Sequence, residues 1–250
     1  MTTTIMPGCE AFSSGEGTRG VLVLHGFTGN PASMRPLAER CAREGYRVAL
    51  PRLPGHGTSV ADMMTTDWSD WSRAALDAYD ELASRCEKVA VVGLSMGGGL
   101  SAYVAEQRDG VAGCVLINPL VQSPGPEMEA GVRDLLDAGL EVLDSIGSDI
   151  KKEGAVEASY DATPLACVAS LFAAMHDVAG NLASISAPCL VISSREDHVV
   201  TPDNGDALVA SVSGPVERIW LEDSYHVATM DNDAELVETS TLEFLAKVLG

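Results

Sequence analysis

The sequence predicts an α/β fold, in which helices cover both faces of a mostly parallel central sheet. Two observations carry this prediction. Short, continuous apolar runs that are typical of buried parallel strands recur along the chain, and stretches with apolar residues at helical spacing separate them. The size agrees, because 250 residues that are 46% hydrophobic and include 24 glycines suit one compact domain with a sizeable core.

The first half of the chain alternates between the two kinds of element. A weak strand is expected near 9–12, and stronger ones at 21–26, 46–50 and 88–92. Helices are expected at about 32–44 and from a cap at Thr66 or Asp67 to about 86. Between them the Pro- and Gly-rich stretch 51–58 is expected to be a loop.

The second half continues the alternation but contains one interruption. Strands are expected at 112–118, 188–194 and 216–221, and a last helix at 232–249. Residues 120–185 show no convincing strand and contain two apolar stripes, Val132, Leu135, Leu136, Leu140 and Leu143 in one and Leu171, Phe172 and Met175 in the other. An insertion after the C-terminal end of a strand lies over the ligand crevice of such sheets. We therefore expect a core of 1–119 and 186–250 with a cap of 120–185.

A Gly-Leu-Ser-Met-Gly stretch at 93–97 lies between the strand at 88–92 and a helix that begins near 98. A strand, G-x-S-x-G and a helix in this order form the context of a nucleophile elbow. Glycine is needed at 93 and 97 because side chains there would collide with the neighbouring strand or block the turn. The sequence thus predicts Ser95 as a nucleophile whose hydroxyl stands clear of the sheet edge.

A serine hydroxyl needs a base, and the chain has five histidines. His226 follows the last expected strand by five residues and so comes off the same sheet edge as Ser95. The acid that orients it is expected at Asp197, just past the strand at 188–194, which completes the order Ser, Asp, His. Rival acids are Glu196, Asp203 and Asp223. The other histidines are expected to orient backbone (His25), to support a loop (His56), to face the rim (His198) or to lie in the cap (His176).

An acyl-transfer site also needs two donors for the oxyanion. One is expected from the backbone N–H of Met96, at the start of the helix after Ser95. The other is expected from the backbone N–H of Phe27, in the loop after the strand at 21–26.

Charge and composition exclude several classes of function. The net charge of −20 opposes binding to nucleic acid and to anionic lipid surfaces, and we expect no stable membrane insertion. The six cysteines lack metal-ligand spacing and pairing rhythm, so neither a metal site nor a disulfide framework is expected. The first residues lack the basic start and apolar core of a signal peptide, which predicts a cytoplasmic protein.

Several stretches together resemble bacterial monoacylglycerol lipases and the similar small carboxylesterases of the α/β-hydrolase superfamily. The resemblance covers about residues 20–248 and rests on LHGFTGNPASMRPLAE, YRVALPRLPGHGT, VVGLSMGG, SREDHVVTP and DSYHVAT. It implies the α/β-hydrolase fold, hydrolysis of monoacylglycerols without a cofactor, a triad of Ser95, Asp197 and His226, and oxyanion donors at Phe27 and Met96. It also implies that Ile146 and Glu157 contact the glycerol headgroup, although the stretches 122–130 and 166–174 diverge from the family.

Other functions remain compatible with the same residues. A general carboxylesterase acting on short- to medium-chain or xenobiotic esters shares the whole triad and differs only in its cap. Thioester or C–C bond hydrolysis is a more distant alternative, and a non-catalytic binding module gives no reason for a complete Ser, Asp and His set. The expected partner is a small-molecule ester, and the chain is expected to act as a monomer or homodimer.

Overall fold

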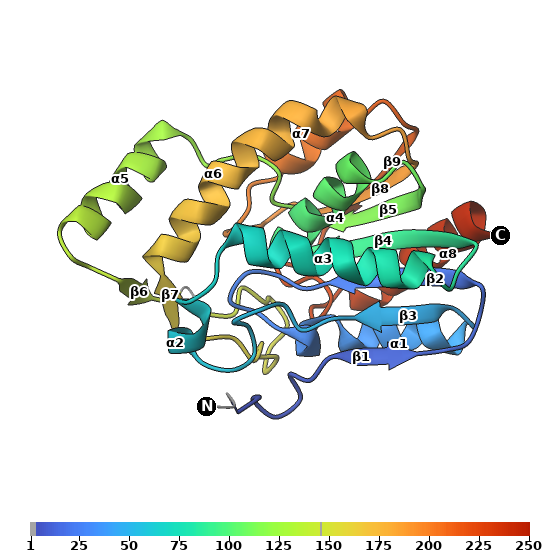
Figure 1. Cartoon of the computed structure of the whole chain (residues 1–250), viewed down its shortest axis with the longest axis horizontal. Helices are drawn as coiled ribbons and strands as arrows, with labels where there is room; N and C mark the ends of the chain where they lie inside the picture. The colour runs from blue at the N-terminus through green and yellow to red at the C-terminus, as the bar shows by residue number, and fades with distance from the viewer. Residues whose placement is uncertain (1–3, 146) are drawn as a thin grey trace.

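A seven-stranded sheet runs through the centre of the molecule (Figure 1). This computed structural model describes residues 4–145 and 147–250. The strand order is β1-β3-β2-β4-β5-β8-β9, and every neighbouring pair is parallel except β1 with β3. The strands are β1 (Phe12–Ser14), β2 (Arg19–Leu24), β3 (Arg47–Leu50), β4 (Lys88–Leu94), β5 (Val111–Ile117), β8 (Cys189–Ser194) and β9 (Val216–Leu221).

Helices cover both faces of this sheet, and the alternation of side chains along the strands explains why. In β2, Leu22 and Leu24 belong to one buried cluster, whereas Val21 and Val23 belong to the other. Helices α3, α4 and α7 pack on the first face, with α6 lying against α3 and α4, and α1 and α8 pack on the second (Figure 1). The α/β fold class that the sequence predicts, a mostly parallel sheet with helices on both faces, is confirmed. These helices are α1 (Arg35–Arg43), α3 (Trp68–Ala83), α4 (Met96–Gln107), α6 (Leu165–Asn181), α7 (Asp203–Ser211) and α8 (Ala234–Leu249).

The start of α3 agrees with its local sequence signal. The Asp67 side chain accepts hydrogen bonds from the backbone N–H groups of Ser69 and Asp70, and the Asp70 side chain accepts from the N–H of Asp67. This capping box satisfies donors that the first turn of a helix leaves unpaired. Two short helical elements belong to the first half of the chain, η1 (Pro31–Ser33) and α2 (Val60–Met63), and a third, η2 (Leu182–Ser184), directly follows α6.

Residues 120–185 differ in two ways from the sequence prediction. They contain a short antiparallel pair, β6 (Val142–Asp144) with β7 (Ala162–Pro164), where no strand is expected. The first apolar stripe is also not one helix, since α5 (Pro126–Asp137) ends before Leu140 and Leu143. Gly139 adopts φ +83° there, and the N–H of Leu140 bonds to the carbonyl of Leu135, as in a Schellman-type helix end. Of the stripe only Val132 is buried in α5.

The second stripe of that segment lies on one helix, as expected. Leu171 and Met175 are buried in the core cluster that also contains residues of α3 and α4. Leu165–Ser184 is the one described helical stretch whose length and composition would fit a membrane span, and 33% of its apolar window is buried. The buried side of this helix packs against α3 and α4, as expected for an amphipathic helix at the surface of a globular protein.

All six cysteines are free, and none lies in a disulfide. Cys114 and Cys189 are neighbours on β5 and β8 and are fully buried, so each packs there as a small apolar residue. Among residues 4–145 and 147–250, no three His, Cys, Asp or Glu side chains gather as a metal site would need.

Because α4 lies so close to β2, a methyl group added at Gly97 should lower the stability of the protein strongly. A Cβ on Gly97 would lie 2.2 Å from the carbonyl oxygen of Leu24, so Gly97→Ala should lower the free energy of unfolding by about 3 kcal/mol. Gly131→Ala is the matched control, because that position in α5 has open space around it, and this change should raise the stability by about 0.5–1 kcal/mol. Urea denaturation measures both; equal stabilities of the two variants would contradict the packing argument.

Candidate active site

Ser95 lies at the turn between β4 and α4, with φ 59° and ψ −122°. A positive φ is unusual for serine, and such backbone persists only where its surroundings hold it. Here the N–H of Ser95 donates to the carbonyl of Ile117 at 3.0 Å, and its own carbonyl accepts from the N–H groups of Gly99 and Leu120. The turn therefore has the geometry of a nucleophile elbow at the C-terminal end of a central strand.

The two glycines of the turn are required by space. A Cβ on Gly93 would lie 2.0 Å from the carbonyl oxygen of Gly97, and one on Gly97 would meet the backbone of Leu24. Contacts this short do not occur between real atoms, so only glycine fits. The collisions that the sequence predicts at both positions are present, one with the neighbouring strand and one within the turn itself.

The imidazole of His226 lies against the carboxylate of Asp197. Their Nδ1 and Oδ2 atoms are 2.8 Å apart, and the side chains are only 8% and 1% exposed. The second oxygen of Asp197 accepts from the backbone N–H groups of Val199 and Val200 at 2.9 and 2.8 Å. With Nδ1–H donated to the carboxylate, a neutral imidazole presents Nε2 as an acceptor, which a general base needs.

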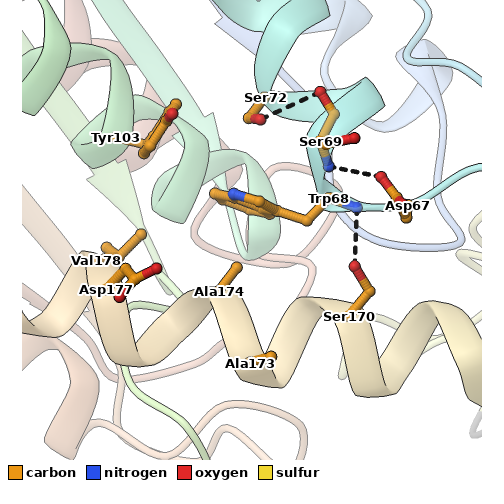
Figure 2. Close-up of a pocket in the computed structure, with 10 residues that line it drawn as sticks. All are labelled: Asp67, Trp68, Ser69, Ser72, Tyr103, Ser170, Ala173, Ala174, Asp177 and Val178. Carbon is orange, nitrogen blue, oxygen red and sulfur yellow. Dashed lines mark hydrogen bonds between the residues drawn. The ribbon is translucent and has the colours of Figure 1, made fainter.

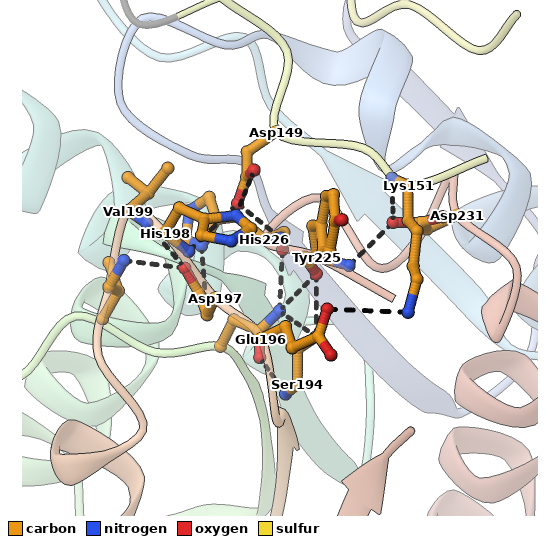
Figure 3. A network of polar contacts seen from close by, with 12 residues as sticks. Asp149, Lys151, Ser194, Glu196, Asp197, His198, Val199, Tyr225, His226 and Asp231 are labelled. Atoms are coloured by element: carbon orange, nitrogen blue, oxygen red, sulfur yellow. Dashed lines mark hydrogen bonds and ion pairs between the residues drawn. The ribbon is translucent and has the colours of Figure 1, made fainter. Parts of the chain in front are cut away.

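The three rival acids lie elsewhere. Glu196 and Asp223 are more than half exposed and pair with the amine of Lys151, at 3.6 and 3.1 Å. Asp203 is exposed in the first turn of α7. Asp197 is thus the candidate acid that contacts the ring of His226 (Figure 3).

The backbone around the oxyanion loop is held by two buried histidines. Nδ1 of His25 lies 3.0 Å from the carbonyl of Gly26, and its Nε2 accepts from the N–H of Leu53, so this ring orients backbone as expected. His56 binds the carbonyl of Pro54 in its own loop, also as expected. The two rings meet edge to face with centroids 5.2 Å apart.

The remaining histidines lie near the surface. His176 is in α6 and contacts Glu129 of α5, with 2.6 Å between Nε2 and Oε1. His198 is 58% exposed, as expected for the rim, but its Nδ1 lies 2.8 Å from the carboxylate of Asp149. This hydrogen bond and the negative charge of Asp149 raise the pKa of His198.

The expected oxyanion donors lie on either side of Ser95. Met96 is the first residue of α4, where backbone N–H groups have no intrahelical acceptor. On the other side, the Gly26 backbone approaches so closely that a Cβ there would lie 3.8 Å from Oγ of Ser95. The ring of Phe27 packs edge to face on Trp71 at 5.6 Å, which fixes the position of the following loop.

A cavity of about 330 Å³ contains the reactive groups. Ser95 and His226 both line it, and its walls are mainly apolar. The other lining residues come from the oxyanion loop, from residues 120–185 and from the loop after Asp197: Phe27, Thr28, Leu120, Pro124, Met128, Ser145, Gly147, Asp149, Glu157, Ser159, Thr163, Leu171, Phe172, Val199, Val200 and Val227.

A larger cavity of about 420 Å³ lies between α3, α4 and α6. Trp68 and Tyr103 meet edge to face there, and Asp177 lies across from them on α6 (Figure 2). None of the candidate catalytic residues lines this cavity. The smaller cavity is therefore the candidate active site.

The two expected headgroup contacts have different outcomes. Glu157 lines the cavity, and its carboxylate packs so closely on the oxyanion loop that a Cβ on Gly29 would lie 2.9 Å from Oε1. Burial raises the pKa of Glu157, against opposing effects of His226 and of a hydrogen bond from Ser33. Ile146 lies outside the described residues, although its neighbours Ser145 and Gly147 line the cavity.

Two polar residues that hold the site are absent from the sequence analysis. The amide of Asn118, just after β5, donates to the carbonyl of His226 at 2.7 Å and accepts from the N–H of Ser194 at 2.7 Å. Its signal is a polar residue at the end of a buried strand. Asp149 accepts from the N–H of His226 at 3.1 Å, and no local pattern marks it because the partners are 77 residues apart.

The buried histidines predict a pH dependence. Burial lowers the pKa of His25 to about 3 and that of His56 to about 4, whereas unfolded histidines titrate near 6.5. The unfolded chain therefore binds more protons between these values, and the contribution of both rings to stability is lost as the pH falls below about 6.5. NMR of the ring nitrogens should show both rings neutral at pH 5, with His198 as the internal control that is still protonated above 6.5. Protonation of either buried ring near pH 6.5 would contradict this.

Comparison with known proteins places the chain in a family. The Alpha/beta hydrolase family matches residues 21–239. The thermostable monoacylglycerol lipase of Bacillus sp. (strain H-257) is 43% identical over 98% of both chains, and a carboxylesterase of Bacillus subtilis (strain 168) is 29% identical over 96% of this chain and 97% of the relative. A solved structure from a study of the metagenome-derived lipolytic enzymes LipS and LipT superposes with a TM-score of 0.93 at 43% identity, and the match covers 98% of this chain and 100% of the other. The protein is a member of the alpha/beta hydrolase family.

Proposed function

We propose that this protein is a serine ester hydrolase that cleaves monoacylglycerols to glycerol and fatty acid through an acyl-enzyme. The observation that carries the proposal is the buried His226–Asp197 pair, of which His226 lines the same cavity as Ser95, the residue at the positive-φ turn after β4. The lipase from Bacillus sp. at 43% identity over nearly the whole chain supports the choice of substrate.

The proposed chemistry follows from these groups. Oγ of Ser95 attacks the ester carbonyl carbon while its proton passes to Nε2 of His226, and Asp197 stabilises the charged imidazole. The oxyanion accepts hydrogen bonds from the N–H groups of Phe27 and Met96. When the C–O bond breaks, the leaving alcohol takes the proton from His226. Water then attacks the acyl-enzyme, its proton passes to His226 and on to Oγ of Ser95, and the fatty acid leaves.

We also propose that residues 120–185 form a cap over a core of 1–119 and 186–250. Met128 of α5 and Leu171 and Phe172 of α6 belong to this segment and line the cavity on its apolar side. An acyl chain needs such a wall, because burial of apolar surface is what binds it. Glu157, on the same segment, is the proposed acceptor for a glycerol hydroxyl, and Ile146 is proposed to bound the headgroup.

A general carboxylesterase is the second candidate. The relative from Bacillus subtilis named as a carboxylesterase, 29% identical over nearly the full length, favours it. Both candidates use the same triad, so the substrate profile decides between them.

The nucleophile is tested by one substitution. Ser95→Ala should lower kcat for a p-nitrophenyl ester by a factor on the order of 10⁶ and abolish labelling by a fluorophosphonate probe, because no other hydroxyl stands at the elbow. Ser84→Ala, which changes an exposed serine at the end of α3, is the matched control and should leave both unchanged. More than trace hydrolysis by Ser95→Ala would overturn the proposed function.

The substrate class is tested by Glu157. The parent enzyme should cleave monoacylglycerols faster than methyl esters of equal acyl length. Glu157→Gln should lower kcat/KM for monoacylglycerols about 10-fold or more, because a neutral amide oxygen replaces the carboxylate as acceptor, and leave the methyl esters unchanged. Glu153→Gln, an exposed change on the same segment, is the control. Equal rates on both ester classes, or equal losses in Glu157→Gln, would favour the general carboxylesterase.

A further inference from the structure

The carboxylate of Asp149 connects the segment 120–185 to both loops that carry the base and its acid (Figure 3). Oδ2 accepts from the backbone N–H groups of His198 and His226 at 3.2 and 3.1 Å, and Oδ1 accepts from the ring of His198 at 2.8 Å. The backbone carbonyl of Asp149 accepts in addition from the N–H of Val227 at 3.1 Å. The side chain is only 12% exposed, so these bonds are largely shielded from water.

These contacts matter because of what else holds His226. Asp197 fixes the direction of its ring through Nδ1, and Asn118 binds its carbonyl at 2.7 Å. Asp149 binds the N–H of the same residue from the other side. The backbone of the base is thus fixed at both ends, and one of the two fixing groups belongs to the inserted segment rather than to the core.

The same carboxylate also reaches the acid. His198 directly follows Asp197 in the chain, and Asp149 holds both its backbone N–H and its ring. One side chain thus bonds to both loops, and a shift of either loop relative to the other would strain a bond to Asp149 in addition to the link that Asn118 makes between Ser194 and His226. A misplacement of about 1 Å between catalytic groups costs about 10²-fold in rate.

We propose that Asp149 is a positioning residue, through which the segment 120–185 holds His226 and the loop of Asp197 in register for the reaction at Ser95. The proposal rests on the proposed function but assigns a role to a residue outside the triad. Asp149 touches no reacting atom in this role and acts through the backbone of His226.

The charge of Asp149 gives an independent readout of the contact. Its carboxylate raises the pKa of His198, whose ring also faces the negative charges of Asp197 and Glu196 and packs edge to face on Tyr225 at 4.6 Å. In Asp149→Asn that negative charge is lost, so the titration midpoint of His198 should fall from its raised position. NMR of the ring measures this without any substrate.

Activity is tested with two variants that remove the bonds stepwise. Asparagine keeps one acceptor oxygen in place of two, and alanine keeps none. We expect kcat to fall about tenfold in Asp149→Asn and about 100-fold in Asp149→Ala, with KM for a p-nitrophenyl ester changed less than about twofold. Rates are normalised to active sites titrated with a fluorophosphonate and measured well below the unfolding midpoint of each variant, so that partial unfolding does not count as lost activity.

Two control variants distinguish the effect of Asp149 from the effects of the His198 ring and of another carboxylate on the loop of His226. His198→Ala removes the ring but keeps both backbone bonds to Asp149 and should retain kcat within about threefold. Asp223→Asn is a matched carboxylate-to-amide change on the loop of His226, at an exposed side chain that pairs with Lys151, and should leave kcat unchanged.

Each result then has one meaning. A folded Asp149→Ala with parental kcat per active site, or a loss that His198→Ala reproduces in full, would overturn the role of Asp149. If the role of Asp149 is overturned in this way but Ser95→Ala is inactive in the same assay, the proposed function stands. If Ser95→Ala remains active, the proposed function fails and the present inference fails with it.

Discussion

The structure of the site depends on the close approach of α4 to the strands β2 and β4. Helix α4 begins directly at the end of β4, with a single residue between them, and this is sterically feasible only because Gly93 and Gly97 carry no side chain. The strain of the left-handed turn at Ser95 is balanced by hydrogen bonds to β5 and to the chain beyond it. The backbone of Ser95 is thereby fixed, while its side chain lines the cavity and can be reached by a substrate.

Around this turn, buried polar groups hold the loops that follow β5, β8 and β9. Loops that follow strands have few apolar contacts of their own, so their backbone groups must find partners. Asn118 links β5, β8 and the loop of His226. Asp231, 1% exposed, accepts from the backbone N–H groups of Lys151, Lys152, Tyr225 and Asn232, each at 2.8 Å. These bonds pair the backbone groups of the loops next to the reacting residues.

The sequence was sufficient to predict the elements whose signal is local. The sheet strands from β2 onward, the cap of α3 at Asp67 and the glycines of the elbow each follow from residues within a few positions of one another. The segment 120–185 was harder, because Gly139 ended a helix that the apolar spacing alone would have continued, and the β6–β7 pair is too short to show alternation. Helix α7 has weak amphipathic spacing and was not anticipated.

The candidate site divides in the same way. Ser95, Asp197 and His226 follow strand ends, and parallel strands bring such ends to one edge, so topology was enough to make them candidates. Among four acids, however, only the structure shows which one contacts His226, since neighbouring loop residues differ in direction rather than in composition. Asp149 and Asp231 could not be found because their partners are mainly backbone N–H groups, which every residue except proline has, so no residue pattern marks them.

The two carboxylates Asp149 and Asp231 also bear on how such proteins diversify. A change of substrate is most simply obtained by exchanging the whole inserted segment for another of different shape. At this junction Asp231 binds backbone of the segment 120–185, whereas Asp149 of that segment binds backbone of the loops after β8 and β9. A transplanted segment would satisfy Asp231 with the backbone of any residues except proline, but it would have to bring its own acceptor for the N–H groups of His198 and His226. Exchange of the segment is therefore conditional on the side chains that it contributes to the junction, Asp149, Tyr160 and Ser170 among them.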